Sequence, residues 1–179
     1  MIAGIVGLLT VALFMLLYYH LPGLLAVIAL LIYTAILFAI YRFLPITLTL
    51  PGIAGFILSI GLAVDANVLI FARLKEELRL GRSLPAAVEN GFRHAWPSIR
   101  DSNASTFITS LILFGFGNSF GVSLIKGFAL TLMIGVVVSL FTAIFVTRTL
   151  LRAVVETGGL NSPWWFGAER PKREPEVTA

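Results

Sequence analysis

The stretch Gly61-Leu-Ala-Val-Asp65-Ala-Asn67-Val-Leu-Ile-Phe71 places one carboxylate in the middle of an apolar run. Asp65 is the single charged residue between Arg42 and Arg73. Inserting a carboxylate into hydrocarbon costs roughly 2.5 to 3.5 kcal/mol, so such a residue is expected inside a helix bundle, beside a partner, an ion or a proton path. Removal from water favours the protonated form of a carboxyl group. Asp65 is therefore a candidate proton carrier.

The composition of the chain is typical of a membrane protein. Hydrophobic residues make up 58% of the 179 residues, charged residues make up 12%, and the mean hydropathy is +0.97. Ordinary globular domains carry about twice that share of charge. The chain has no cysteine, and His20 and His94 have no ligand spacing around them, so we expect no metal site. The net charge of +4 is better explained by orientation in a bilayer than by nucleic-acid binding, because the basic residues flank apolar segments.

Five segments approach the length of about 20 residues that a helix needs to cross a membrane. They predict an all-α, polytopic bundle of five transmembrane helices over residues 1–156. The fourth segment is the most polar, since Arg100 and Asp101 lie near its start. The predicted crossings are residues 2–19, 24–41, 50–72, 97–117 and 125–147.

The distribution of cations predicts the orientation of the bundle. Arginines and lysines are concentrated in residues 73–96 and just after them, whereas the opposite loops offer only Arg42 and Lys126. The loop 73–96 is therefore expected on the cytoplasmic side. Five crossings then place the amino terminus outside and the carboxyl terminus in the cytoplasm, in agreement with the cations that follow the last helix.

The central loop and the carboxy-terminal tail have patterns of their own. Apolar and charged residues alternate in 73–96 at spacings that suit short amphipathic helices lying along the inner membrane face. This loop is either a solvated hairpin that only enforces topology or a docking surface for a cytoplasmic partner. Residues 157–179 are rich in proline, glycine and charge, and we expect them to form a disordered cytoplasmic tail.

A stripe of small residues runs along the third predicted helix. Residues on such a stripe allow two helix backbones to approach closely in a membrane. We expect it to contact a partner subunit, because half a bundle would leave it without a neighbour. At 100° per residue, Asp65 lies about 120° to one side of the stripe and Asn67 about 80° to the other. The stripe consists of Gly52, Gly55, Ser59, Ala63 and Ala66.

Three interpretations of Asp65 remain open. It is a structural acid held by hydrogen bonds from neighbouring helices, or it forms a fixed ion pair with Arg100 or a partner's arginine, or it is a carrier whose protonation changes helix packing. We favour the third interpretation, because nearby residues supply amides and hydroxyls for water or a proton relay. These residues are Asn103, Ser105, Thr106 and Thr109.

Several motifs resemble the carboxy-terminal membrane portion of the SecD family, a group of bacterial protein-export subunits in the resistance-nodulation-division superfamily. The resemblance runs to about Leu151, and the motifs have the family's order and spacing. They are Val64-Asp65-Ala-Asn67, Glu76-Glu77-Leu-Arg79, Asp101-Ser-Asn103, Lys126-Gly-Phe-Ala129 and Val146-Thr-Arg148.

The resemblance implies a role in the bacterial inner membrane. Members of this family act with a SecF-like subunit and the Sec translocon channel, and they use the proton-motive force, not a bound cofactor, to draw preproteins outward. It implies that Asp65 is the intramembrane proton-relay residue. Asp101 and Asn103 match a second polar cluster, and Arg100 stands where SecF has an arginine. With Asn67 and Thr106, these residues form the predicted relay.

The family pattern also includes a first helix and an extracytoplasmic head domain that binds the preprotein, and neither precedes the matching segment here. We therefore expect that this chain does not grip a preprotein by itself. The alternatives are a proton-driven exporter of a lipid or small solute from the same superfamily, and a membrane scaffold without transport chemistry. We find no catalytic constellation of an enzyme.

Overall fold

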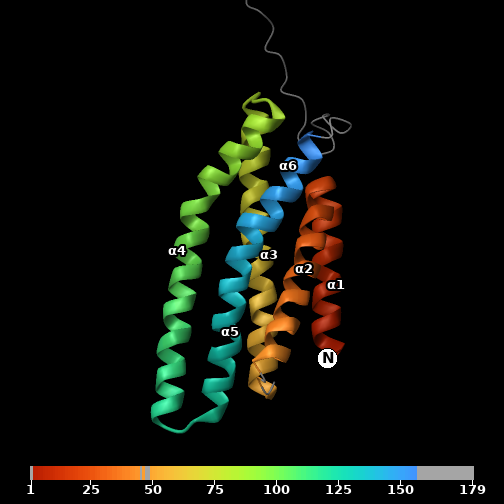
Figure 1. Cartoon of the computed structure of the whole chain (residues 1–179). Helices are drawn as coiled ribbons and strands as arrows, with labels where there is room; N and C mark the ends of the chain where they lie inside the picture. The colour runs from red at the N-terminus through yellow and green to blue at the C-terminus, as the bar shows by residue number, and fades with distance from the viewer. Residues whose placement is uncertain (1, 45, 47–48, 157–179) are drawn as a thin grey trace, which may run out of the picture.

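The computed structural model describes residues 2–44, 46 and 49–156, and these residues form helices joined by short turns (Figure 1). Within them no strand occurs, so the prediction of an all-helical bundle is confirmed. The predicted tail, residues 157–179, lies outside the described residues. The elements are α1 (Ile2–Tyr19), α2 (Leu21–Phe43), α3 (Leu50–Arg79), α4 (Leu84–Ser119), α5 (Ser123–Phe141), the π-helix η1 (Thr142–Thr147) and α6 (Arg148–Glu156).

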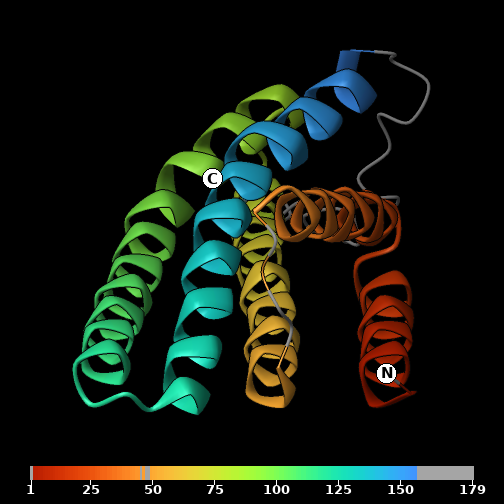
Figure 2. The same ribbon diagram turned by 60° about the horizontal axis from the view of Figure 1, so that its bottom comes forward.

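The five long helices lie side by side. Helices α3 and α5 occupy the middle, α4 lies on one side of them, and α1 and α2 lie on the other (Figures 1 and 2). Helix α5 continues through η1 into α6 without a break. The turn between α3 and α4 and the whole of α6 lie at the same end of the bundle, which we call the cationic end because Arg79, Arg82 and Arg152 are there.

Three of the described helical segments are long and apolar enough to cross a membrane: Leu21–Phe43, Leu50–Arg79 and Ser123–Glu156. The apolar helix Leu9–Tyr19 is shorter. Helix α4 is not among the three, because the polar residues from Arg100 to Asn103 dilute its apolar character. Both α1 and α4 run alongside the three apolar segments (Figure 1).

The central loop is much shorter than predicted. Helix α3 continues to Arg79 and α4 already begins at Leu84, so the predicted amphipathic segments are parts of two long helices and not separate short ones. The apolar residues of this region pack on one another as a helical hairpin, with Leu74 and Leu78 of α3 in one cluster with Ala87 and Val88 of α4. The amphipathic pattern therefore marks the contact between two extended helices.

The small-residue stripe of α3 packs against α5 of the same chain. A Cβ atom on Gly55 would lie 2.7 Å from the carbonyl oxygen of Phe128, and one on Gly135 would overlap the side chain of Ser59. Ala63 packs in one cluster with Val138 of α5, and Gly52 faces the Thr131 methyl group. The expectation that the stripe is left for a partner subunit is therefore wrong, because α5 already fills that position.

Hydrogen bonds join α2 to the same stripe of α3. The hydroxyl of Tyr33 on α2 donates to Ser59 Oγ at 2.8 Å, and Ser59 Oγ donates to the carbonyl oxygen of Phe56 at 2.7 Å. Tyr33 and Ser59 are both buried. A buried hydroxyl without a partner costs about 1–3 kcal/mol, so these bonds favour one rotation of α3 about its axis.

Replacing Gly55 by leucine is expected to destabilise the bundle by about 1–3 kcal/mol, because the side chain cannot fit between α3 and α5. Gly61 on the same helix provides a matched control, since no atom lies within 4 Å of a Cβ built there. The denaturation midpoint in detergent, followed by circular dichroism, should fall for Gly55→Leu and stay or rise for Gly61→Leu. Equal midpoints for the two variants would contradict the packing described here.

Candidate functional site

Asp65 lies on the flank of the bundle between α3 and α4. Its side chain is exposed, whereas Ala66 and Asn67 beside it are buried. We expected this bundle to enclose Asp65, but the stripe of α3 faces α5 and thereby turns Asp65 toward the outer flank. Among the residues that the structure describes, Asp65 makes no hydrogen bond and no ion pair. The carboxylate is therefore available to a proton or to a group outside this chain.

A small pocket of about 40 Å³ adjoins this carboxylate. Three of the predicted relay residues line it: Asp65 from α3, and Asn103 and Thr106 from α4. Ser102 adds a hydroxyl, and the remaining lining residues are apolar: Leu62, Ala66, Leu69 and Ile99. The pocket is large enough to hold a water molecule, and its polar side chains can form hydrogen bonds with that water. The pocket is thus suited to a water that links Asp65 to the polar face of α4.

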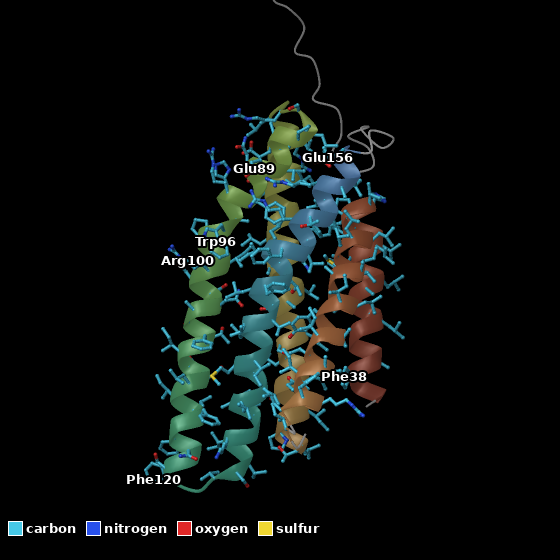
Figure 3. All side chains as sticks on the ribbon, viewed as in Figure 1. Phe38, Glu89, Trp96, Arg100, Phe120 and Glu156 are labelled. Atoms are coloured by element: carbon cyan, nitrogen blue, oxygen red, sulfur yellow. The ribbon has the colours of Figure 1, made fainter. Side chains whose placement is uncertain are left out.

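Arg100 and Asp101 are not part of this pocket. Arg100 Nε donates to Asp101 Oδ1 at 2.9 Å, and both side chains are exposed. Figure 3 shows Arg100 on the outer side of α4, pointing away from the other helices. The interpretation of Asp65 as the ion-pair partner of Arg100 is therefore wrong for this structure, because Arg100 is paired with its chain neighbour.

Asn67 lies on the opposite side of α3 from the pocket and binds the π-helix. Thr147 Oγ1 donates to Asn67 Oδ1 at 2.9 Å, and both residues are buried. Single-turn π-helices within α-helices are rare and occur frequently at functional sites. The bond joins Asn67 of the Asp65-Ala-Asn67 motif to the junction of η1 and α6.

Asn103 connects the pocket to α5. Its Nδ2 donates to the carbonyl oxygen of Ile99 at 2.8 Å, and its Oδ1 accepts from Ser139 Oγ at 3.3 Å. Asn103 and Ser139 are buried. These bonds hold the amide of Asn103 in a fixed orientation at the wall of the pocket.

Sequence reasoning did not identify Ser139 and assigned no role to Thr147, although Thr147 lies in the Val146-Thr-Arg148 motif. Both are buried hydroxyls in the apolar segment Ser123–Glu156. A buried polar side chain in a membrane helix requires a hydrogen-bond partner, and this signal was present in the sequence. The sequence does not show how α5 and η1 are rotated about their axes. This rotation brings the two hydroxyls into hydrogen bonds with Asn67 and Asn103.

The described residues contain no group of three or more histidine, aspartate or glutamate side chains that could hold a metal ion. The chemistry available in the pocket is that of one carboxyl group, one amide and two hydroxyls. These groups can accept, hold and pass on a proton through hydrogen bonds.

Comparison with known proteins places the chain in a family. Residues 1–157 match the family described as protein export membrane protein SecD/SecF, C-terminal. The protein translocase subunit SecD of Thermobaculum terrenum is 61% identical over 97% of this chain and 34% of the relative. SecD of Dehalococcoides mccartyi is 59% identical over 87% of this chain and 35% of the relative. The chain thus spans about a third of the length of these relatives.

Solved structures agree with this assignment. The crystal structure of SecDF from Thermus thermophilus, described as a translocon-associated membrane protein, matches 87% of this chain and 21% of that chain, with 39% identity and a TM-score of 0.82. A structure of SecDF in its super-membrane-facing form has a TM-score of 0.81, with 39% identity over 88% of this chain and 21% of that chain. This chain therefore belongs to the SecD/SecF family of protein export membrane proteins and corresponds to its carboxy-terminal membrane portion.

Proposed function

We propose that the chain is the proton-coupling membrane portion of a SecD-type subunit, which uses the proton-motive force to assist preprotein translocation across the bacterial inner membrane. The observation that carries this proposal is the unpaired carboxylate of Asp65 beside the pocket formed with Asn103 and Thr106. A carboxylate without a partner in a membrane helix is costly. Protonation removes that cost, so the charge of Asp65 can be coupled to the way α3 packs.

The surrounding hydrogen bonds are suited to such coupling. Ser139 holds Asn103 on one side of α3, and Thr147 holds Asn67 on the other. A change in the charge of Asp65 would alter the contact between α3 and α4, while the bonds to α5 and η1 would pass that change toward α6. In this proposal the relay consists of Asp65, Asn103 and Thr106, and Asn67 positions α3 against η1.

The proposed partners follow from family membership. SecD and SecDF relatives are named protein translocase subunits, and we propose that this chain acts with a SecF-like subunit beside the Sec translocon channel. The preprotein would be held by a head domain outside the residues of this chain. The exposed flank that carries Asp65 is available to the SecF-like subunit, whereas the small-residue stripe is already occupied by α5.

We propose that the cationic end of the bundle lies in the cytoplasm. Its arginines and lysines far outnumber the two cations near the opposite end, Arg42 and Lys126, and such asymmetry sets orientation during insertion. The amino terminus then lies outside and α6 lies inside.

Cysteine labelling tests this orientation. In intact cells, a cysteine at Ser83 is expected to react with a membrane-permeant maleimide and resist an impermeant one, because Ser83 precedes α4 at the cationic end. A cysteine at Ser119, at the other end of α4, is expected to react with both reagents. Both serines are exposed. The reverse labelling pattern would overturn the proposed orientation.

Removal of the titrating group of Asp65 tests the proposed function. Asp65→Asn keeps the size of the side chain but cannot cycle a proton, so the complex is expected to assemble and to export at the rate seen without a gradient. Asp65→Glu is expected to retain part of the gradient response. The measurement is preprotein translocation with and without a proton gradient, in proteoliposomes that contain the complete SecD-type protein, its SecF-like partner and the translocon.

Asp101→Asn is the matched control for this experiment. It makes the same chemical change at a carboxylate that is exposed, paired with Arg100 and outside the pocket, and we expect it to keep the full gradient response. A full response from Asp65→Asn would contradict the proposed function and leave Asp65 as a structural acid. An equal loss of the gradient response in Asp65→Asn and Asp101→Asn would contradict the proposal that the carboxylate at the pocket is the one that couples protons.

A further inference from the structure

A second and larger pocket, of about 320 Å³, lies between α4 and the segment where η1 passes into α6. Its volume is within the range of about 300–1,000 Å³ that small-molecule sites occupy. Most of its wall is apolar and comes from α3, α4 and η1: Ile70, Phe92, Trp96, Ile99, Ala143 and Ile144. This pocket is separate from the one at Asp65, although Ile99 contributes to both.

The polar lining residues of this pocket are Glu89, Arg93 and Arg148. The lining residues of α4 share one face of the helix, because each lies three or four residues from another. They are Glu89, Phe92, Arg93, Trp96 and Ile99. This face extends about 15 Å along the helix axis. Figure 3 shows Glu89 nearer the cationic end and Trp96 farther along α4. The pocket is therefore charged toward the cationic end and apolar toward the middle of the bundle.

The charged part of the pocket has an excess of positive charge. Arg148 and Arg152 both bind the carboxylate of Glu89, at Oε1 and at Oε2. The hydrogen bond from Arg152 is the largest influence on this carboxylate and lowers the pKa of Glu89, so Glu89 stays ionised. Arg93 makes no ion pair within the described part of the chain. Two arginines, Arg93 and Arg148, against one glutamate leave the lining of the pocket with one excess positive charge, and Arg152 adds a further cation beside Glu89.

Arg148 has hydrogen-bonding capacity that the protein does not use. Its guanidinium lies over the ring of Phe92, at 5.9 Å from the centroid, and one amino group binds Glu89. Its Nε is buried and has no acceptor among the described residues. A buried donor without an acceptor is costly, and an anionic oxygen is the acceptor that binds a guanidinium best.

We propose that this pocket binds an anionic phospholipid from the leaflet at the cationic end of the bundle. The phosphate group binds Arg93 and Arg148, and the first part of an acyl chain lies along Trp96, Ile99 and Ile144. A free phosphate would use the arginines but not the apolar wall, and a purely apolar ligand would leave the cations unused. Basic pockets between membrane helices are known to take anionic headgroups, and a tryptophan at this level is typical of the membrane interface.

Tryptophan quenching by brominated lipids tests this site. The chain has three tryptophans, and replacing Trp164 and Trp165 by phenylalanine leaves Trp96, which is 39% exposed, as the reporter. The chain is placed in phosphatidylcholine nanodiscs that contain either brominated phosphatidylglycerol or brominated phosphatidylcholine at equal mole fraction. We expect stronger quenching by the phosphatidylglycerol, and inorganic phosphate in excess should leave that quenching unchanged.

Arg93→Gln is the informative variant, because Arg93 is exposed and its loss breaks no ion pair. The relative affinity for phosphatidylglycerol over phosphatidylcholine is expected to fall about fivefold. Arg79→Gln, the same charge change on α3 at the same end of the bundle but outside this pocket, should leave it unchanged. Circular dichroism checks that both variants fold.

Three results would overturn the proposal. Equal quenching by the two brominated lipids would show that the pocket does not select an anionic headgroup. Displacement of the lipid by inorganic phosphate would show that the site takes a free anion. Equal losses in Arg93→Gln and Arg79→Gln would show that the preference comes from the charge of the whole surface.

Discussion

The close contact between α3 and α5 determines the direction in which each face of α3 points. Gly55 and Ser59 lie where the two backbones approach, since a Cβ on Gly55 would meet Phe128 and one on Gly135 would overlap Ser59. Because residues follow one another at 100° around a helix, this contact also fixes where the rest of α3 faces. Asn67 turns toward η1, and Asp65 turns toward the flank beside α4. A packing contact about two to three turns away thus determines that the acid is exposed and that the amide is buried.

The polar side chains of the last membrane segment extend this arrangement toward the cationic end. Ser139 holds Asn103, and Thr147 at the end of the π-helix holds Asn67. The next residues carry Arg148 and Arg152, which bind Glu89 of α4. Helix α5 with η1 and α6 is therefore one continuous element that contacts the proposed proton site near its middle and the ion pairs at its end. A shift of α3 at Asp65 would reach the cationic end of the bundle along this element.

The sequence predicted the helical bundle and the presence of a polar site, because apolar length and a lone carboxylate are local signals. It also placed Asp65, Asn103 and Thr106 in one candidate site, and these three residues meet at the pocket. Predictions from the sequence were wrong where they depended on which helices are neighbours in the bundle. The stripe of Gly55 and Ser59 indicates close helix packing but does not indicate which helix packs there. The amphipathic pattern of residues 73–96 is compatible with a helix on the membrane surface and with a hairpin whose two helices pack on each other. Arg100 and Asp101 are adjacent in sequence, and their mutual ion pair removed both from the expected relay.

The proposed coupling requires that Asp65 changes its protonation state in the membrane, and carbon-13 NMR of the aspartate carboxyl carbons measures this change. The chain contains two aspartates, Asp65 and Asp101, so a bilayer sample labelled at these carbons gives two signals, which Asp101→Asn assigns. The Asp65 signal is expected to move between the positions of the protonated and the ionised carboxyl as the pH is varied while the bundle remains folded. An Asp65 signal that stays at one position over that range would show that Asp65 does not exchange a proton.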